Sequence, residues 1–217
     1  MNRSFVQDLL FTNYHKGRNI FTDEYKTITD KLSEGFYSEK RSKFLAFAVH
    51  VTTEQQVKDI VQQYRKKYYD ARHVCYAYVL GADRELFRAN DDGEPSSTAG
   101  KPILGQITKN ELTDILIIVV RYYGGVNLGT SGLIVAYRTA AAEAIENAEI
   151  VSKYCEEEVD FSFPYIMMND VMKVIKEMSP NIISQKYDNL CEFKLSIRRS
   201  LAPILREKLD KLAFKDD

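Results

Sequence analysis

Apolar residues follow two different spacings along this chain, one typical of strands and the other of helices. From Phe44 to Val51 both alternating sets are largely apolar, which predicts a strand covered on both faces. The segment from Ile115 to Val120 is apolar throughout and predicts a central strand. His73 to Leu80 also has strand composition, and Lys26 to Glu39 is expected to add one or two strands.

Helical spacing lies between and after these strands. Residues 54–68 form an amphipathic pattern, and Thr53 and Gln56 before and within it have the spacing of a capping box. A short helix is expected over 98–110. A later stripe of small and apolar side chains predicts a helix that packs closely on a sheet: Leu133, Ala136, Tyr137, Ala140, Ala144, Ile145 and Ala148.

The last third of the chain repeats the mixture of elements. Residues 159–165 alternate as a half-exposed strand does, and 169–178 has a helical pattern that ends before Pro180. Two strands, 182–187 and 191–198, are predicted to form a hairpin. Ser200 is expected to cap a last helix. The order strand, helix, strand, strand, helix predicts a second domain, so the fold class is α+β.

Composition narrows the class of protein. The 217 residues carry 30 basic and 31 acidic side chains, so no global basic field indicates nucleic-acid binding, although a local patch stays open. Cys75, Cys155 and Cys191 form no CxxC pair and are interpreted as reduced thiols. No apolar run of about 18 residues occurs. We therefore expect a soluble, cytoplasmic protein with no membrane contact, no metal and no cofactor.

Two loops rich in glycine, proline and charge carry the candidate chemistry. The acidic loop is residues 91–102, and the glycine loop is residues 121–132. Loops held by a rigid scaffold are where binding and catalysis concentrate. The candidate binding residues in and around them are Arg41, Lys43, His73, Asp91, Asp92, Glu94, Thr98, Lys101, Arg121, Gly124, Gly125 and Gly129.

The glycine loop lies between a predicted strand and a predicted helix, which is typical of an anion site. N–H groups at a helix N-terminus face such a ligand, and Arg121 would add a bidentate phosphate contact. Neither the Walker nor the dinucleotide spacing is present. The alternative is that Gly124, Gly125, Gly129 and Gly132 only serve turn geometry at positive φ.

The acidic loop allows two interpretations. Asp91, Asp92 and Glu94 could hold Mg²⁺ or act as acid and base. One short loop offers no second cluster of ligands, and Asp-Gly and Glu-Pro are ordinary turn sequences, so a structural or protein-contact role is favoured. Lys101 or Arg121 could also pair with these carboxylates and lock the two loops together.

Two further features allow a functional and a structural interpretation. His73 and Cys75 would share one face of a strand, as a Cys–His nucleophile pair requires, but a structural histidine and a core cysteine are favoured. Basic residues interleaved with tyrosines could form a patch, although a solvated helix end is favoured. The patch would comprise Lys40, Arg41, Lys43, Arg65, Lys66, Lys67 and Arg72.

Four segments resemble the signature motifs of the YigZ/IMPACT family. They are SEKRSKF (38–44), DARHVCYAY (70–78), DDGEPSSTAGKP (91–102) and VVRYYGG followed by LG (119–129). The resemblance covers about residues 24–150 in the right order. It implies that 23–151 form a domain like elongation factor G domain IV and a ribosomal-protein domain, with a left-handed βαβ crossover, against the usual rule.

The resemblance also implies that 156–217 form a ferredoxin-like domain, similar to domain V of elongation factor G. Residues 1–22 lie outside the resemblance as an amino-terminal extension. Because the sequence ends at Asp217 soon after the last predicted helix, a closing strand of the second sheet is expected to be absent or very short.

Eukaryotic members of the family are translation regulators, which compete for the activating partner of a stress-responsive initiation-factor kinase. The hypothesis that follows is a non-catalytic binding module linked to the regulation of translation, with RNA, the ribosome or a translation protein as its partner. One alternative is a Mg²⁺-dependent enzyme on a phosphorylated or nucleotide substrate. The other is a pure protein-interaction module. The sequence leaves the oligomeric state open.

Overall fold

The computed structural model describes residues 23–213 and divides the chain into two compact units. One unit is Tyr25–Lys153, and the other begins at Tyr154 and includes Asp23 and Glu24. Each unit contains both helices and strands around its own hydrophobic core, so the expected α+β class with two domains is confirmed. The expected amino-terminal extension, 1–22, lies outside the described residues.

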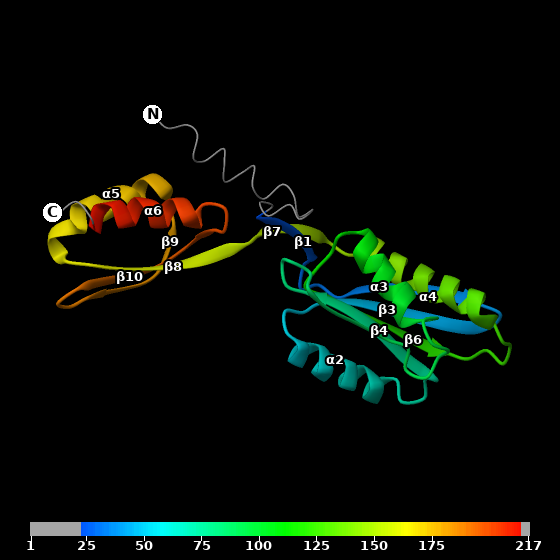
Figure 1. Cartoon of the computed structure of the whole chain (residues 1–217). Coiled ribbons are helices and arrows are strands. Elements are labelled where there is room, and N and C mark those ends of the chain that lie inside the picture. Colours follow the sequence, from blue (N-terminus) through cyan, green and yellow to red (C-terminus); the bar gives the residue numbers. More distant parts are fainter. Residues whose placement is uncertain (1–22, 214–217) are drawn as a thin grey trace. The chain divides into compact units, whose positions relative to one another are not determined.

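A five-stranded antiparallel sheet forms the centre of the first unit (Figure 1). Its strands, in spatial order, are β2 (Ser33–Glu39), β3 (Ser42–His50), β6 (Ile115–Tyr122), β4 (His73–Leu80) and β5 (Leu86–Asn90). The predicted central strand is β6, which lies in the middle of the sheet and is fully buried from Ile115 to Val120.

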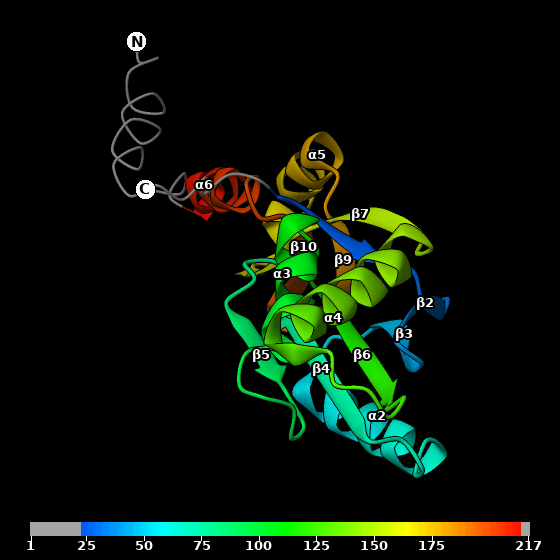
Figure 2. The same cartoon turned by 90° about the vertical axis from the view of Figure 1, so that its right-hand side faces the viewer.

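Helices cover both faces of this sheet (Figure 1, Figure 2). Helix α2 (Glu54–Lys67) packs on one face, while α3 (Gly100–Lys109) and α4 (Gly129–Glu146) pack on the other. Strands β3 and β4 both run antiparallel to β6, so they are parallel to each other and are joined through α2. This is the expected βαβ unit; its left-handed crossover stays a prediction.

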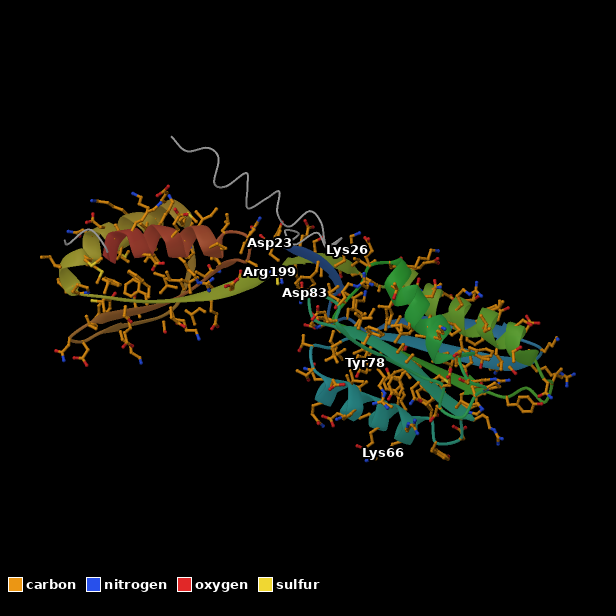
Figure 3. All side chains as sticks on the ribbon, in the orientation of Figure 1. Asp23, Lys26, Lys66, Tyr78, Asp83 and Arg199 are labelled. Carbon is orange, nitrogen blue, oxygen red and sulfur yellow. The ribbon has the colours of Figure 1, made fainter. Side chains whose placement is uncertain are left out.

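The capping box predicted for α2 is present. The Thr53 hydroxyl accepts from the Gln56 backbone N–H at 3.2 Å, and the Gln56 side chain accepts from the Thr53 N–H at 3.2 Å. Tyr78 lies on the α2 side of the sheet, while Lys66 points away from it (Figure 3). Burial and the nearby Glu54 carboxylate raise the pKa of Tyr78 to about 12.

Two short strands outside the predicted elements form further pairings. Strands β5 and β7 (Ile150–Tyr154) were not predicted from the sequence, and β7 pairs with β1 (Glu24–Ile28) in a two-stranded sheet. The region expected to hold one or two strands therefore holds two, β1 and β2, and they belong to different sheets.

The second unit has the predicted order βαββα. Its antiparallel sheet has the order β8 (Glu156–Phe163), β10 (Cys191–Arg198) and β9 (Asn181–Tyr187). A short 3-10 turn, η2 (Tyr165–Met167), leads into α5 (Met168–Met178), and α6 (Ala202–Ala213) packs with α5 on one face. This is a ferredoxin-like arrangement with three strands among residues 23–213; the residues after α6, where a closing strand was expected to be absent or very short, lie outside the described part of the chain.

One predicted cap in this unit is wrong. Ser200 was expected to cap the last helix, but its hydroxyl donates to the Asp23 carboxylate, and its backbone N–H donates to the same group at 2.8 Å. Helix α6 begins two residues later, at Ala202. The partner lies 177 positions away in the sequence, so local spacing could not reveal it.

Candidate functional site

The acidic loop and the glycine loop line one open cleft of about 660 Å³ in the first unit. The end of β6 and the start of β4 bring them together, because Arg121 and His73 are register partners in the sheet. The residues that line the cleft are Arg72, His73, Gly93, Glu94, Pro95, Arg121, Tyr123, Asn127, Leu128, Gly129, Thr130 and Leu133. The volume lies within the range of small-ligand sites in proteins.

A buried ion pair joins the two loops. The Arg121 guanidinium Nη1 lies 2.6 Å from Glu94 Oε1, and the two side chains are 7% and 3% exposed. The Tyr137 hydroxyl donates to the same Glu94 oxygen at 2.7 Å. Of the two partners considered for the acidic loop, Arg121 rather than Lys101 therefore locks the loops together. Desolvated charges of this kind are stable only when paired and hydrogen-bonded.

The Arg121 guanidinium is also held between aromatic rings. Its central carbon lies 5.5 Å from the centroid of the buried Phe44 ring and 5.5 Å from that of Tyr123, which lines the cleft. The Nε atom is buried and, among the described residues, has no hydrogen-bond partner. One donor of a charged side chain is thus left unused beside the cleft.

Asp91 caps helix α3. One carboxylate oxygen accepts from the backbone N–H groups of Ala99 at 3.0 Å and Gly100 at 2.8 Å. The other oxygen accepts from the Ser97 N–H at 2.9 Å. A carboxylate at a helix N-terminus satisfies free donors and complements the helix dipole. Asp91 therefore has a structural task, which agrees with the favoured interpretation of this loop.

Asp92 fixes the acidic loop to β4. Its carboxylate accepts from the Val74 N–H at 2.7 Å and pairs with Arg65 of α2. The residue has a φ of 44°, in the left-handed region, and Gly93 follows at 86°. With Glu94 bound to Arg121, each of the three carboxylates is engaged by protein donors. No group of three or more metal-ligating side chains is found in residues 23–213.

His73 faces the cleft with one ring nitrogen. Its Nδ1 lies 2.8 Å from the Asp92 carbonyl oxygen, which can only accept, so Nδ1 carries a proton. In the neutral ring Nε2 is then an acceptor, and it lies 3.9 Å from Glu94 Oε1. The histidine is thus oriented by the acidic loop, with its Nε2 beside the ion pair.

Cys75 does not form a nucleophile pair with His73. It is fully buried, with its Sγ atom 3.0 Å from the Asp91 carbonyl oxygen and 3.3 Å from the Tyr137 hydroxyl. Burial raises the pKa of the Cys75 thiol and that of the Tyr137 phenol, so both stay protonated at neutral pH. The structure agrees with the favoured interpretation of Cys75 as a core residue.

The glycines of the second loop serve different purposes. A Cβ at Gly124 would lie 2.2 Å from the backbone carbonyl carbon of Arg41, so only glycine allows this close approach to the β2–β3 turn. Gly125 and Gly129 have φ values of 83° and 72°. Positive φ thus accounts for Gly125 and Gly129, as the alternative interpretation expected, and the close approach accounts for Gly124. Gly132 lies within α4 and, like Gly124, does not have positive φ, so the alternative is wrong for these two glycines.

The N-terminus of α4 opens toward the cleft. The helix begins at Gly129, and no side chain caps it. Leu128, Gly129 and Thr130 line the cleft. The first N–H groups of an α-helix have no partner within the helix, so the uncapped first turn of α4 offers donors to a ligand.

Comparison with known proteins shows to which family this chain belongs. The family model described as the Impact N-terminal domain matches residues 40–145, which include both loops and the whole cleft. IMPACT family member YvyE of Bacillus subtilis is 31% identical over 173 residues, 80% of each chain. IMPACT family member YigZ of Escherichia coli is 34% identical over 187 residues, 82% of this chain and 92% of that protein. The chain belongs to the IMPACT family.

Among solved structures, one has a similar fold over most of this chain. A protein described as hypothetical superposes with a TM-score of 0.67 at 27% identity, over 89% of this chain and 94% of its own. The two-domain translational regulator Yih1 aligns over 55% of this chain and 48% of its own at 24% identity, with a TM-score of 0.37. The first of these likenesses covers both units of the chain.

Some predicted site residues lie away from the cleft. Arg41 and Lys43 are exposed at the β2–β3 turn and after it, and Lys101 is exposed on α3. Thr98 is buried, and its hydroxyl donates to the Pro95 carbonyl oxygen at 2.6 Å, which is a turn contact. None of these four side chains lines the cleft, so a role for them in binding stays a prediction.

Other cleft residues were not among the candidates. Arg72 was noticed only as part of a basic patch, and Tyr123, Asn127 and Thr130 were not singled out. Tyr123, Asn127 and Thr130 all belong to the glycine loop, so their position in the loop is the sequence signal for them. Among residues 23–213, no helix is long and apolar enough to cross a membrane.

Proposed function

We propose that this IMPACT-family protein is a non-catalytic binding module in the regulation of translation, and that it contacts RNA, the ribosome or a translation protein through the cleft. The observation that carries the proposal is the contrast between the two loops. The acidic loop binds its own chain, whereas the glycine loop leaves backbone donors at the cleft surface, next to the exposed Arg72 that precedes β4. Family membership supports the translational part, because eukaryotic members regulate translation.

Binding is favoured over catalysis by the state of the reactive groups. The Cys75 thiol is buried and protonated, and the three acidic-loop carboxylates are held by protein donors. A Mg²⁺ ion would have to displace these donors before it could bind. The cleft therefore offers cations and N–H groups to a partner, but its carboxylates are committed to the fold.

One observation favours a second candidate, an enzyme on a phosphorylated or nucleotide substrate. His73 has its Nδ1 fixed on a backbone carbonyl oxygen and its Nε2 beside Glu94 in the cleft. That orientation suits a general base. This candidate predicts turnover that is lost in His73→Gln, and an assay across phosphoesters and nucleotides that detects no product would exclude it.

Sedimentation of cell lysate on sucrose gradients at low and high salt tests the main proposal. The variant is Arg72→Glu, which reverses an exposed charge in the cleft, and the matched control is Arg138→Glu, an exposed arginine on α4 outside the cleft. We expect wild type and the control to co-migrate with ribosomal particles at low salt, and the Arg72 variant to stay at the top.

Each outcome of the gradients bears on the proposal. Contacts to RNA phosphates weaken steeply with salt, so co-migration should be lost at high salt. If wild type stays at the top of the gradient at every salt concentration, ribosome binding is refuted. Crosslinking that then recovers a single protein and no nucleic acid would support a pure protein-interaction module instead.

A further inference from the structure

We infer that the cleft is a phosphate-binding site, in which the N–H groups of the first turn of α4 and the guanidinium of Arg72 hold the phosphate. The inference rests on the proposed binding function and names the chemical class of its ligand, a phosphate carried by a nucleotide unit. The two ideas can fail separately, because phosphate binding is measurable on the purified chain without ribosomes or lysate.

The first support is the uncapped start of α4. This helix is 18 residues long, and its first turn lines the cleft. Aligned peptide dipoles place about half a positive charge at a helix N-terminus, next to free N–H donors. In the same unit, the free N–H groups at the start of α3 donate to the Asp91 carboxylate, Gly100 at 2.8 Å and Ala99 at 3.0 Å. A bound anion would accept from the free N–H groups of α4, as the Asp91 carboxylate accepts from those of α3.

The second support is independent of the helix. The Arg121 side chain is only 7% exposed and lines the cleft, yet its buried Nε has no hydrogen-bond partner among the described residues. A buried donor left unpaired costs about 1–3 kcal/mol, so native structures leave few of them. A ligand oxygen that enters the cleft, with a small adjustment of the guanidinium, would satisfy this donor.

Charge in the cleft also favours an anion. Two arginines, Arg72 and Arg121, face a single carboxylate, Glu94, which is already neutralised by Arg121 at 2.6 Å. The exposed Arg72 guanidinium has no ion pair or hydrogen bond within residues 23–213. The Arg72 charge and the positive end of the α4 dipole are therefore not neutralised by the protein.

The size of the cleft and its exposed ring indicate what carries the phosphate. A volume of about 660 Å³ is larger than a lone phosphate needs. Tyr123 lines the cleft and is 48% exposed, while its hydroxyl donates to Asn127 at 3.2 Å and its ring packs on Arg121. A ring fixed in this way offers a flat surface on which a base can stack.

The test uses the full chain and follows backbone amide and arginine side-chain Nε–H resonances by NMR. The probes are inorganic phosphate, adenosine monophosphate and a short single-stranded oligoribonucleotide, each against chloride at the same ionic strength. We expect saturable shifts at Gly129, Thr130 and Ser131 and at the Arg121 Nε–H. Shifts with the monophosphate would identify a free nucleotide as a sufficient ligand, and shifts with the oligonucleotide alone would identify a strand phosphate.

Two variants make the test specific. Arg72→Ala should weaken binding of the responding probe at least about tenfold, because it removes a charge-assisted contact. Arg138→Ala is the matched control and should bind as wild type does, since it removes an exposed arginine of α4 outside the cleft. Equal affinity in all three proteins would overturn the site.

Failure of this inference is distinguishable from failure of the proposed function. If no probe shifts the α4 amides while the protein still co-migrates with ribosomal particles, the phosphate site is refuted and the binding module stands. If a probe binds in the cleft while the protein stays at the top of every gradient, the site stands and ribosome binding is refuted.

Discussion

The acidic loop and the glycine loop satisfy their polar groups in opposite ways. In the acidic loop Asp91 binds the start of α3, Asp92 binds β4 and α2, and Glu94 binds Arg121. The glycine loop has few side chains that could do this, and its helix starts without a cap. The loop richer in charge is therefore the structural one, while the loop richer in glycine, apart from Arg121, which pairs with Glu94, leaves the backbone donors of its helix free.

The two helix N-termini show the same contrast at the level of the backbone. Helices α3 and α4 lie on the same face of the sheet (Figure 2), and both begin at a glycine. The Asp91 carboxylate occupies the first, whereas the cleft lies at the second. Because the helix dipole acts alike on both, the difference arises from the side chain placed at each end.

The largest effect is expected from breaking the contact between the two loops. Glu94→Ala should lower the free energy of unfolding by about 3–5 kcal/mol, because it leaves the Arg121 charge buried without a partner. Urea unfolding followed by circular dichroism measures the change. Glu94→Gln is the control that keeps an acceptor for Tyr137, and it should cost less. Equal stability of Glu94→Ala and wild type would show that the pair does not hold the loops.

The second prediction concerns the close approach in the glycine loop. Gly124→Ala should cost about 1–3 kcal/mol, since the added Cβ would lie 2.2 Å from the Arg41 carbonyl carbon. Gly105→Ala is the matched control: this helical glycine has no atom within 4 Å of an added Cβ. It should raise stability by up to about 1 kcal/mol. Thermal unfolding of both variants compares them, and a neutral Gly124→Ala would contradict the packing.

The third prediction removes the anion from α3. Asp91→Ala should cost about 0.5–2 kcal/mol, the usual value of a lost N-terminal cap. Asp91→Asn keeps a side-chain oxygen as acceptor and should cost less. Amide hydrogen exchange locates the effect, with faster exchange expected at Ala99 and Gly100. Unchanged exchange there would show that Asp91 does not cap the helix.

Much of the fold follows from spacing along the sequence. Strand β4 has the predicted bounds, and the α2 capping box and the buried β6 are present as expected, because each depends on neighbours within a few residues. Strands β5 and β7 escaped prediction because they are short and largely exposed, so their apolar pattern is weak. Their pairing depends on tertiary context.

The site could be predicted only in part. Both loops were recognised, but choosing between Arg121 and Lys101 as the partner of the acidic loop requires the register of β6 against β4, which local sequence does not give. Arg72 lies directly before β4 and beside Arg121. The Arg72 backbone N–H donates to the Arg121 carbonyl oxygen at 3.0 Å. That neighbourhood exists only once the sheet has formed.

The smallest effect on stability should come from a substitution of Arg72, which lines the open cleft. Arg72→Ala removes an exposed side chain that has no ion pair or hydrogen bond within the described residues, so the free energy of unfolding should stay within about 0.5 kcal/mol of wild type. Urea unfolding checks this. The charges of the acidic loop are committed to folding, and that of Arg72 is not. A clear loss of stability in Arg72→Ala would mean that the Arg72 charge also serves the fold, and it would remove the cation that the binding cleft is argued to offer.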